Sequence, residues 1–106
     1  MKKINCPVRK ALDIIGGKWT LYLIHQVGND TIRYGELKRK VDGISEKMFV
    51  NELKMLVENG ILSKKSYGEI PPRVEYSLTD FGKELLPLIE NLAQIGMKNL
   101  ALKNEL

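Results

Sequence analysis

Cysteine and histidine are almost absent from this chain, since each occurs once among 106 residues. A single cysteine, Cys6, allows no disulfide within one chain, and Cys6 and His25 are not at a spacing typical of a metal site. We therefore expect no bound metal, no other cofactor, and a structural role for His25. A Gly-rich phosphate loop and a nucleophile with a matched base are also missing, so we expect no catalytic activity.

Long apolar runs are missing too. No segment has membrane-spanning length, and no apolar stretch of signal-peptide length follows the basic start of the chain. These absences, with the single cysteine, predict no membrane association and a reducing, cytoplasmic location. No repeat, low-complexity run or linker divides the chain, and 43% of its residues are hydrophobic. We therefore expect a single domain, residues 1–106, around one core.

Positive charge is in excess, with a net charge of +4. The excess is uneven, because residues 1–78 carry 14 Lys and Arg against 9 Asp and Glu, while residues 79–106 carry 3 against 4. A basic segment of this kind is consistent with a nucleic-acid partner but does not prove one.

Two helices are predicted before residue 30. Pro7 suits the first position of a helix, where its missing N–H is no loss, and Gly16 and Gly17 end that helix. A second helix is expected from about residue 18 to 27, and it should be buried because apolar residues cover most of its circumference. Residues 31–33 are expected to add a short strand.

A helix-turn-helix is predicted over about residues 34–59. Its first helix runs over about residues 34–41, and Gly43 tolerates the positive φ that a sharp corner often demands. Ser45 is expected to cap the second helix, which Asn59 and Gly60 end. The expected inward face of this second helix consists of Met48 or Phe49, Leu53, Leu56 and Val57.

A basic hairpin, the wing, is predicted over about residues 62–78. Residues 73–78 alternate polar and apolar side chains, as a half-buried strand does. Pro71 and Pro72 stiffen a protruding loop between the strands, although an ordinary proline-stiffened hairpin would look the same. A helix-turn-helix followed by a wing predicts a winged helix, mainly α with a small β-hairpin (α+β), and double-stranded DNA as its partner.

The residues expected to contact DNA lie on the outer side of the second helix and on the wing. On the helix, Asn can pair with adenine, Lys with guanine acceptors, and a Ser hydroxyl can hold phosphate, while Arg at the base of the wing can reach a phosphate or the minor groove. The candidates are Ser45, Glu46, Lys47, Asn51, Lys54, Lys64 and Arg73. A merely solvated polar face is the alternative, in which case the chain would be a non-catalytic winged-helix module that binds protein.

The last segment predicts a helix over about residues 80–100, capped by Thr79. Pro87 lies too deep for the first turn of such a helix and should kink or break it, at a cost of about 3 kcal/mol. A chain of this size has little interior for the many Leu and Ile that follow, so we expect a second subunit to cover them. The expected dimerisation residues are Val8, Leu12, Leu88, Leu92 and Ile95. The alternative is a helix that closes the core of a monomer.

Cys6 lies at a helix N-terminus and close in sequence to Lys2, Lys3, Arg9 and Lys10. The helix dipole and positive neighbours both stabilise a thiolate, which would make Cys6 reactive. The alternative is a small buried apolar residue.

Six short motifs, in order and at natural spacing, closely resemble the HxlR-type transcriptional regulators of bacteria. They are residues 6–8, 15–20, 33–37, 43–48, 59–61 and 71–79, with the sequences CPV, IGGKWT, RYGEL, GISEKM, NGI and PPRVEYSLT. The resemblance implies a homodimeric winged helix, related in architecture to the MarR group, that binds operator DNA. It places the turn and the start of the recognition helix at residues 43–48 and the wing at residues 71–73.

The resemblance also suggests which chemical signals the regulator responds to. Some HxlR-type regulators use a cysteine at the position of Cys6, just before the proline, to sense oxidants or electrophiles. A pocket between the DNA-binding lobe and the dimer helices is expected to admit an unidentified small-molecule effector. The chain departs from the pattern at Ile95 and Gly96, where many members have a Trp-Gly pair, and this affects the expected detail of dimer packing.

Overall fold

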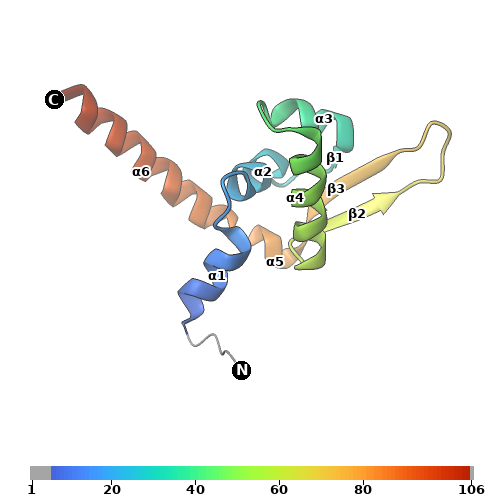
Figure 1. The fold of residues 1–106 in the computed structure, drawn as a ribbon, viewed down its shortest axis with the longest axis horizontal. Helices are drawn as coiled ribbons and strands as arrows, with labels where there is room; N and C mark the ends of the chain where they lie inside the picture. Colours follow the sequence, from blue (N-terminus) through green and yellow to red (C-terminus); the bar gives the residue numbers. More distant parts are fainter. Residues whose placement is uncertain (1–5, 106) are drawn as a thin grey trace.

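The computed structural model describes residues 6–105, and Figure 1 shows how their helices and strands are arranged. The elements are α1 (Pro7–Ile15), α2 (Thr20–Val27), β1 (Ile32–Arg33), α3 (Tyr34–Lys40), α4 (Glu46–Glu58), β2 (Leu62–Ser66), β3 (Val74–Leu78), α5 (Asp80–Lys83) and α6 (Leu86–Glu105). A helix-turn-helix formed by α3 and α4 is followed by a hairpin of β2 and β3. The predicted winged helix, mainly helical with a small sheet, is confirmed.

Local sequence signals set the turn between α3 and α4. Gly43 has a φ of +90°, a conformation that residues with a Cβ rarely adopt. The Ser45 hydroxyl oxygen accepts a hydrogen bond from the backbone N–H of Met48 at 3.2 Å, so Ser45 caps α4 as predicted. Of the two candidates for the inward face, Phe49 is fully buried, whereas Met48 is 43% exposed.

The sheet is antiparallel, with strand order β1-β3-β2. Tyr76 on the central strand lies opposite Ile32 on one side and opposite Lys64 on the other. Because partners in register share a face, Lys64 projects from the same face of the sheet as the buried Tyr76 ring. Beyond β2 and β3 the hairpin extends away from the body as the wing loop (Figure 1).

The core lies between α2, α3, α4 and one face of the sheet. Its completely or almost completely buried side chains come from all of these elements: Leu23, Ile24, Val27, Leu37, Phe49, Leu56, Ile61 and Leu62. Each such side chain contributes about 1.5–3 kcal/mol of hydrophobic stabilisation. A partly buried polar contact also joins α2 to α4, because the hydroxyl of the buried Thr20 donates to a Glu52 carboxylate oxygen at 2.8 Å. The position of α4 is thus fixed on its inner side.

The C-terminal segment forms two helices, with a break near Pro87. Thr79 caps as expected, accepting a hydrogen bond from the N–H of Gly82 at 3.0 Å, but α5 ends at Lys83. The next helix, α6, begins at Leu86, so Pro87 is in its first turn, where a missing N–H is no loss. The predicted break of the helix near Pro87 is confirmed. Only its position differs, because the break falls before Pro87, which therefore lies in the first turn of a new helix.

Helices α1 and α6 extend from the body on the side away from the wing (Figure 1). The Cα radius of gyration is 15.9 Å, compared with about 13 Å for a compact chain of this length. No residue of α1 is buried, and beyond Ile89 every residue of α6 whose side chain the structure describes is exposed. The two helices therefore leave apolar side chains without a covering layer in the monomer.

Candidate nucleic-acid interface

The outer face of α4 carries a polar stripe. Lys47, Asn51 and Lys54 are all exposed, and their spacing of four and three residues places them along one side of the helix. On the opposite side Phe49, together with other core residues, fixes the helix to the body. The stripe is therefore presented on a rigid element, as recognition of base edges requires.

Glu46, the first residue of α4, has a partner that the sequence analysis did not find. The Tyr34 hydroxyl donates a hydrogen bond to Oε2 of Glu46. The Tyr34 ring also stands edge-on to Phe49, with ring centroids 5.1 Å apart and an interplanar angle of 64°. The hydrogen bond to Glu46, followed by burial, raises the pKa of Tyr34 to about 12. Tyr34 thus keeps its proton and remains a donor, and only the proximity of two helix starts could have suggested this pairing from the sequence.

A groove runs between α4 and the sheet. It has a volume of about 400 Å³, an apolar floor that includes Val50, Leu53 and Val74, and two lysines, Lys54 and Lys64. These two side chains come from different elements, the recognition helix and β2, but line the same groove. The structure therefore brings together two of the cations that the sequence predicts to contact DNA.

Arg73 is engaged within the wing. Its guanidinium carbon is 3.9 Å from the centroid of the Tyr67 ring, and Nη2 is 3.2 Å from a carboxylate oxygen of Glu69. The Tyr67 hydroxyl donates a hydrogen bond to Oε1 of Glu75 at 2.7 Å. The Nζ of Lys65 lies over the same ring, 4.9 Å from its centroid. Arg73, which the sequence predicts to contact DNA, lies at the base of the wing with the Tyr67 ring and two carboxylates around its guanidinium.

The five expected dimerisation residues are exposed on the two projecting helices. On α1, Val8 is 66% and Leu12 is 56% exposed. On α6, Leu88, Leu92 and Ile95 are 39%, 42% and 62% exposed. A monomer core therefore does not account for these side chains.

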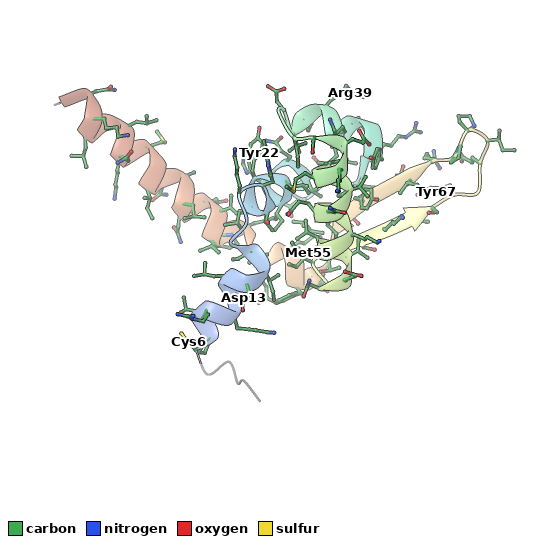
Figure 2. All side chains as sticks on the ribbon, in the orientation of Figure 1. Cys6, Asp13, Tyr22, Arg39, Met55 and Tyr67 are labelled. Atoms are coloured by element: carbon green, nitrogen blue, oxygen red, sulfur yellow. The ribbon has the colours of Figure 1, made fainter. Side chains whose placement is uncertain are left out.

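Cys6 and His25 are both exposed. Cys6 is the N-cap residue of α1 and lies far from the wing residue Tyr67 (Figure 2). The basic neighbours Lys2 and Lys3 lie outside the described residues. Within residues 6–105, no group of three His, Cys, Asp or Glu side chains is placed to hold a metal ion. No helix in that same range is long and apolar enough to cross a membrane.

A shallow hollow of about 240 Å³ lies between α2 and α6, at the junction where an effector pocket was expected. Its lining includes Tyr22 and His25 from α2, and Ile89 and Leu92 from α6. Tyr22 also reaches α3, because its hydroxyl lies 3.4 Å from the carbonyl oxygen of Lys40. The hollow thus lies between α6 and a helix, α2, that contacts the helix-turn-helix.

The capped recognition helix with its polar stripe, the preceding helix and the adjacent wing together define a winged helix-turn-helix protein of the DNA-binding class. The chain belongs to the HxlR-like helix-turn-helix family, whose model matches residues 14–104. Family membership makes it a helix-turn-helix regulator of transcription.

Individual relatives agree with this assignment. The HTH-type transcriptional regulator YkvN of Bacillus subtilis is 38% identical over 96 residues, which cover 91% of this chain and 81% of YkvN. A MarR-family structure from Porphyromonas gingivalis W83 has a TM-score of 0.88 and 54% identity, and the match covers 93% of this chain and 97% of that one. The oxidised form of the redox regulator HypR has a TM-score of 0.81 and 36% identity, over 88% and 96% of the two chains.

Proposed function

We propose that the chain acts as one domain, residues 1–106, in a homodimer that binds a roughly palindromic operator. The observation that carries this proposal is the exposed stripe of Lys47, Asn51 and Lys54 beside Lys64 on the neighbouring strand. Two copies of the stripe would read half-sites about one helical turn, or 34 Å, apart.

Each residue of the stripe has a distinct role in this proposal. Asn51 pairs with adenine, and Lys47 donates to guanine acceptors in the major groove. Lys54 and Lys64 hold the phosphate strand that passes between α4 and the wing, and the Ser45 hydroxyl can still donate to a phosphate while its oxygen caps the helix. Arg73 reaches a phosphate or the minor groove from the base of the wing, and exchanges its partly exposed ion pair with Glu69 for that contact.

The second subunit is held by the apolar faces of α1 and α6, through Val8, Leu12, Leu88, Leu92 and Ile95. Three features support this arrangement: the exposure of all five side chains, the large radius of gyration and the projection of both helices on one side. Covering these side chains removes apolar surface from water, which is the main favourable term in subunit association.

The operator is first identified by sequencing the genomic DNA fragments that the protein binds. Fluorescence anisotropy with labelled duplexes of that sequence then tests the proposal. Loss of Lys54 should weaken binding to all DNA and flatten the salt dependence, because one phosphate contact is removed. Loss of Asn51 should relax sequence preference instead. Lys98→Ala, an exposed lysine of α6, is the matched control. If Asn51→Ala and Lys54→Ala both bind like the parent, the reading face is misplaced and a protein-binding module becomes the better reading.

The regulator responds, in this proposal, to oxidants or electrophiles through Cys6. Support comes from the exposed thiol at the start of α1 and from the similarity to the redox regulator HypR. With one cysteine per chain, oxidation to a disulfide joins Cys6 to another subunit or to a separate thiol. DNA binding measured before and after diamide, in the parent and in Cys6→Ser, tests this. Binding by the parent that diamide leaves unchanged would contradict it.

The remaining parts of the proposal concern location and ligands. A regulator of this kind works in the cytoplasm, without catalysis, and the hollow between α2 and α6 is where a small effector would bind. An effector there would contact α2 and α6, and α2 in turn contacts α3 through the Tyr22 hydroxyl, which is how it would change DNA binding. Leu21→Trp, which fills the hollow from α2, should then abolish the response to a small-molecule effector while leaving operator binding and the response to diamide intact.

A further inference from the structure

We propose that Tyr34 determines base specificity by holding the Glu46 carboxylate in place as an acceptor for the exocyclic amino group of a cytosine. This inference rests on the proposed function, because it assigns one base position within the operator. Tyr34 acts through Glu46 and is therefore a positioning residue, whereas Glu46 makes the contact with the base.

The geometry fixes the carboxylate from two sides. Glu46 is the first residue of α4, directly after the cap Ser45, so its backbone is held by the start of the helix. Tyr34 is the first residue of α3, and its hydroxyl holds Oε2 of Glu46. The Tyr34 ring is itself fixed by its edge-on contact with Phe49, which is fully buried. The start of the recognition helix therefore carries a carboxylate that is anchored to the core through one aromatic ring.

The chemistry of this carboxylate favours one class of base contact. Glu46 is exposed, and its Oε1 receives no hydrogen bond from the described residues. In the major groove cytosine presents an amino donor alone, adenine presents an amino donor beside its N7 acceptor, and guanine and thymine present acceptors that a carboxylate repels. Cytosine is therefore the base that suits the Glu46 carboxylate best. A carboxylate also gains nothing from phosphates, so its effect is on sequence choice and not on general affinity.

The proton of the pair stays on Tyr34. The raised pKa of Tyr34, caused mainly by the hydrogen bond to Glu46, keeps the hydroxyl a donor at neutral pH. Glu46 is then the acceptor in this bond and keeps its second oxygen available for a base. Without the hydroxyl, the Glu46 side chain would be free to rotate away from the DNA major groove. Contact with cytosine would then require ordering the Glu46 side chain, which costs conformational entropy and weakens the contact.

The simpler reading is that the hydrogen bond only fastens α3 to α4. Tyr34→Phe separates the two readings, because phenylalanine keeps the ring against Phe49 and removes only the hydroxyl. Tyr22→Phe is the matched control, since its hydroxyl also joins two helices, reaching the Lys40 carbonyl, but lies on α2. Melting temperature reports the fastening role, and base preference reports the specificity role.

The experiment selects bound duplexes from a randomised pool with the parent, Tyr34→Phe, Tyr22→Phe and Glu46→Ala. We expect the parent to prefer cytosine at one position in each half-site by about 5- to 150-fold, the usual range for one specific base contact. This preference should fall at least fivefold in Tyr34→Phe and vanish in Glu46→Ala, with other positions and non-specific affinity little changed. Tyr22→Phe should select the same sites as the parent.

Two outcomes would overturn the inference. In the first, Tyr34→Phe selects the same bases as the parent at every position. In the second, Tyr34→Phe loses affinity for all sequences equally and melts at a lower temperature, as a purely structural fastening predicts. A parent that selects no sequence at all would instead overturn the proposed function, so the two failures are distinguishable.

Discussion

Replacing Ile95 with alanine should weaken subunit association strongly. Ile95 is 62% exposed in the monomer, and full burial of such a side chain is worth about 2 kcal/mol. The surface still available for burial by a partner is therefore worth about 1.2 kcal/mol per subunit. Both subunits of a symmetric dimer carry the change, so the loss is about 2.5 kcal/mol, or about sixtyfold in the dissociation constant.

Sedimentation equilibrium across a range of micromolar concentrations measures this dissociation constant directly. Ile70→Ala is a matched control, because Ile70 is the same residue type and is 99% exposed, but it lies at the tip of the wing. We expect Ile70→Ala to dimerise like the parent. The helical content of each variant, measured by circular dichroism, should be unchanged.

Two results would refute the reasoning. A parent that remains monomeric at micromolar concentration would show that the apolar faces of α1 and α6 are not covered by a second copy. A dimer in which Ile95→Ala and Ile70→Ala have the same dissociation constant as the parent would show that the subunits meet elsewhere.

Three further predictions concern single residues of the DNA-binding lobe. Ser45→Ala removes the cap of α4 and should lower the free energy of unfolding by about 1 kcal/mol in urea titrations, whereas Ser45→Asp, which keeps a capping oxygen, should not. Gly82→Ala should leave little folded protein by circular dichroism, because the new Cβ would lie 2.2 Å from the backbone oxygen of Ile61. The pKa of Tyr34 is raised to about 12 from 10.0, so its contribution to stability is complete below pH 10 and is lost as the pH rises toward 12. The parent should therefore lose more stability than Tyr34→Phe between these pH values, and equal losses in thermal melts would contradict the assignment.

The sequence predicted the features that depend on neighbouring residues. Gly43 at the corner and Ser45 at the cap were identified because a positive φ and a capping oxygen are requirements of single positions. The stripe on α4 follows from helical periodicity in the same way. These local requirements were enough to predict the order of all the principal elements.

The features that sequence reasoning missed depend on partners distant along the chain. Tyr34 and Glu46 are twelve residues apart, and nothing in either motif indicates that they meet. Arg73 carries a charge suited to DNA, but the hairpin places Tyr67 and Glu69 around it, which no periodicity reveals. Pro87 indicated a break in the C-terminal helix, but the end of α5 depends on how that segment packs, so the exact start of α6 could not be located from the sequence.

The separation of Cys6 from the wing limits how a signal can act. Cys6 lies at the outer end of α1, on the side of the molecule away from the wing, so chemistry at its thiol cannot alter a contact with a base (Figure 2). In a dimer joined through α1 and α6, such a change can only move one copy of α4 relative to the other. The two half-sites of the operator lie a fixed distance of about 34 Å apart, so both α4 helices can bind only when their separation matches it. Oxidation of Cys6 would then weaken operator binding by changing the distance between the two α4 helices, while each α4 keeps its own structure.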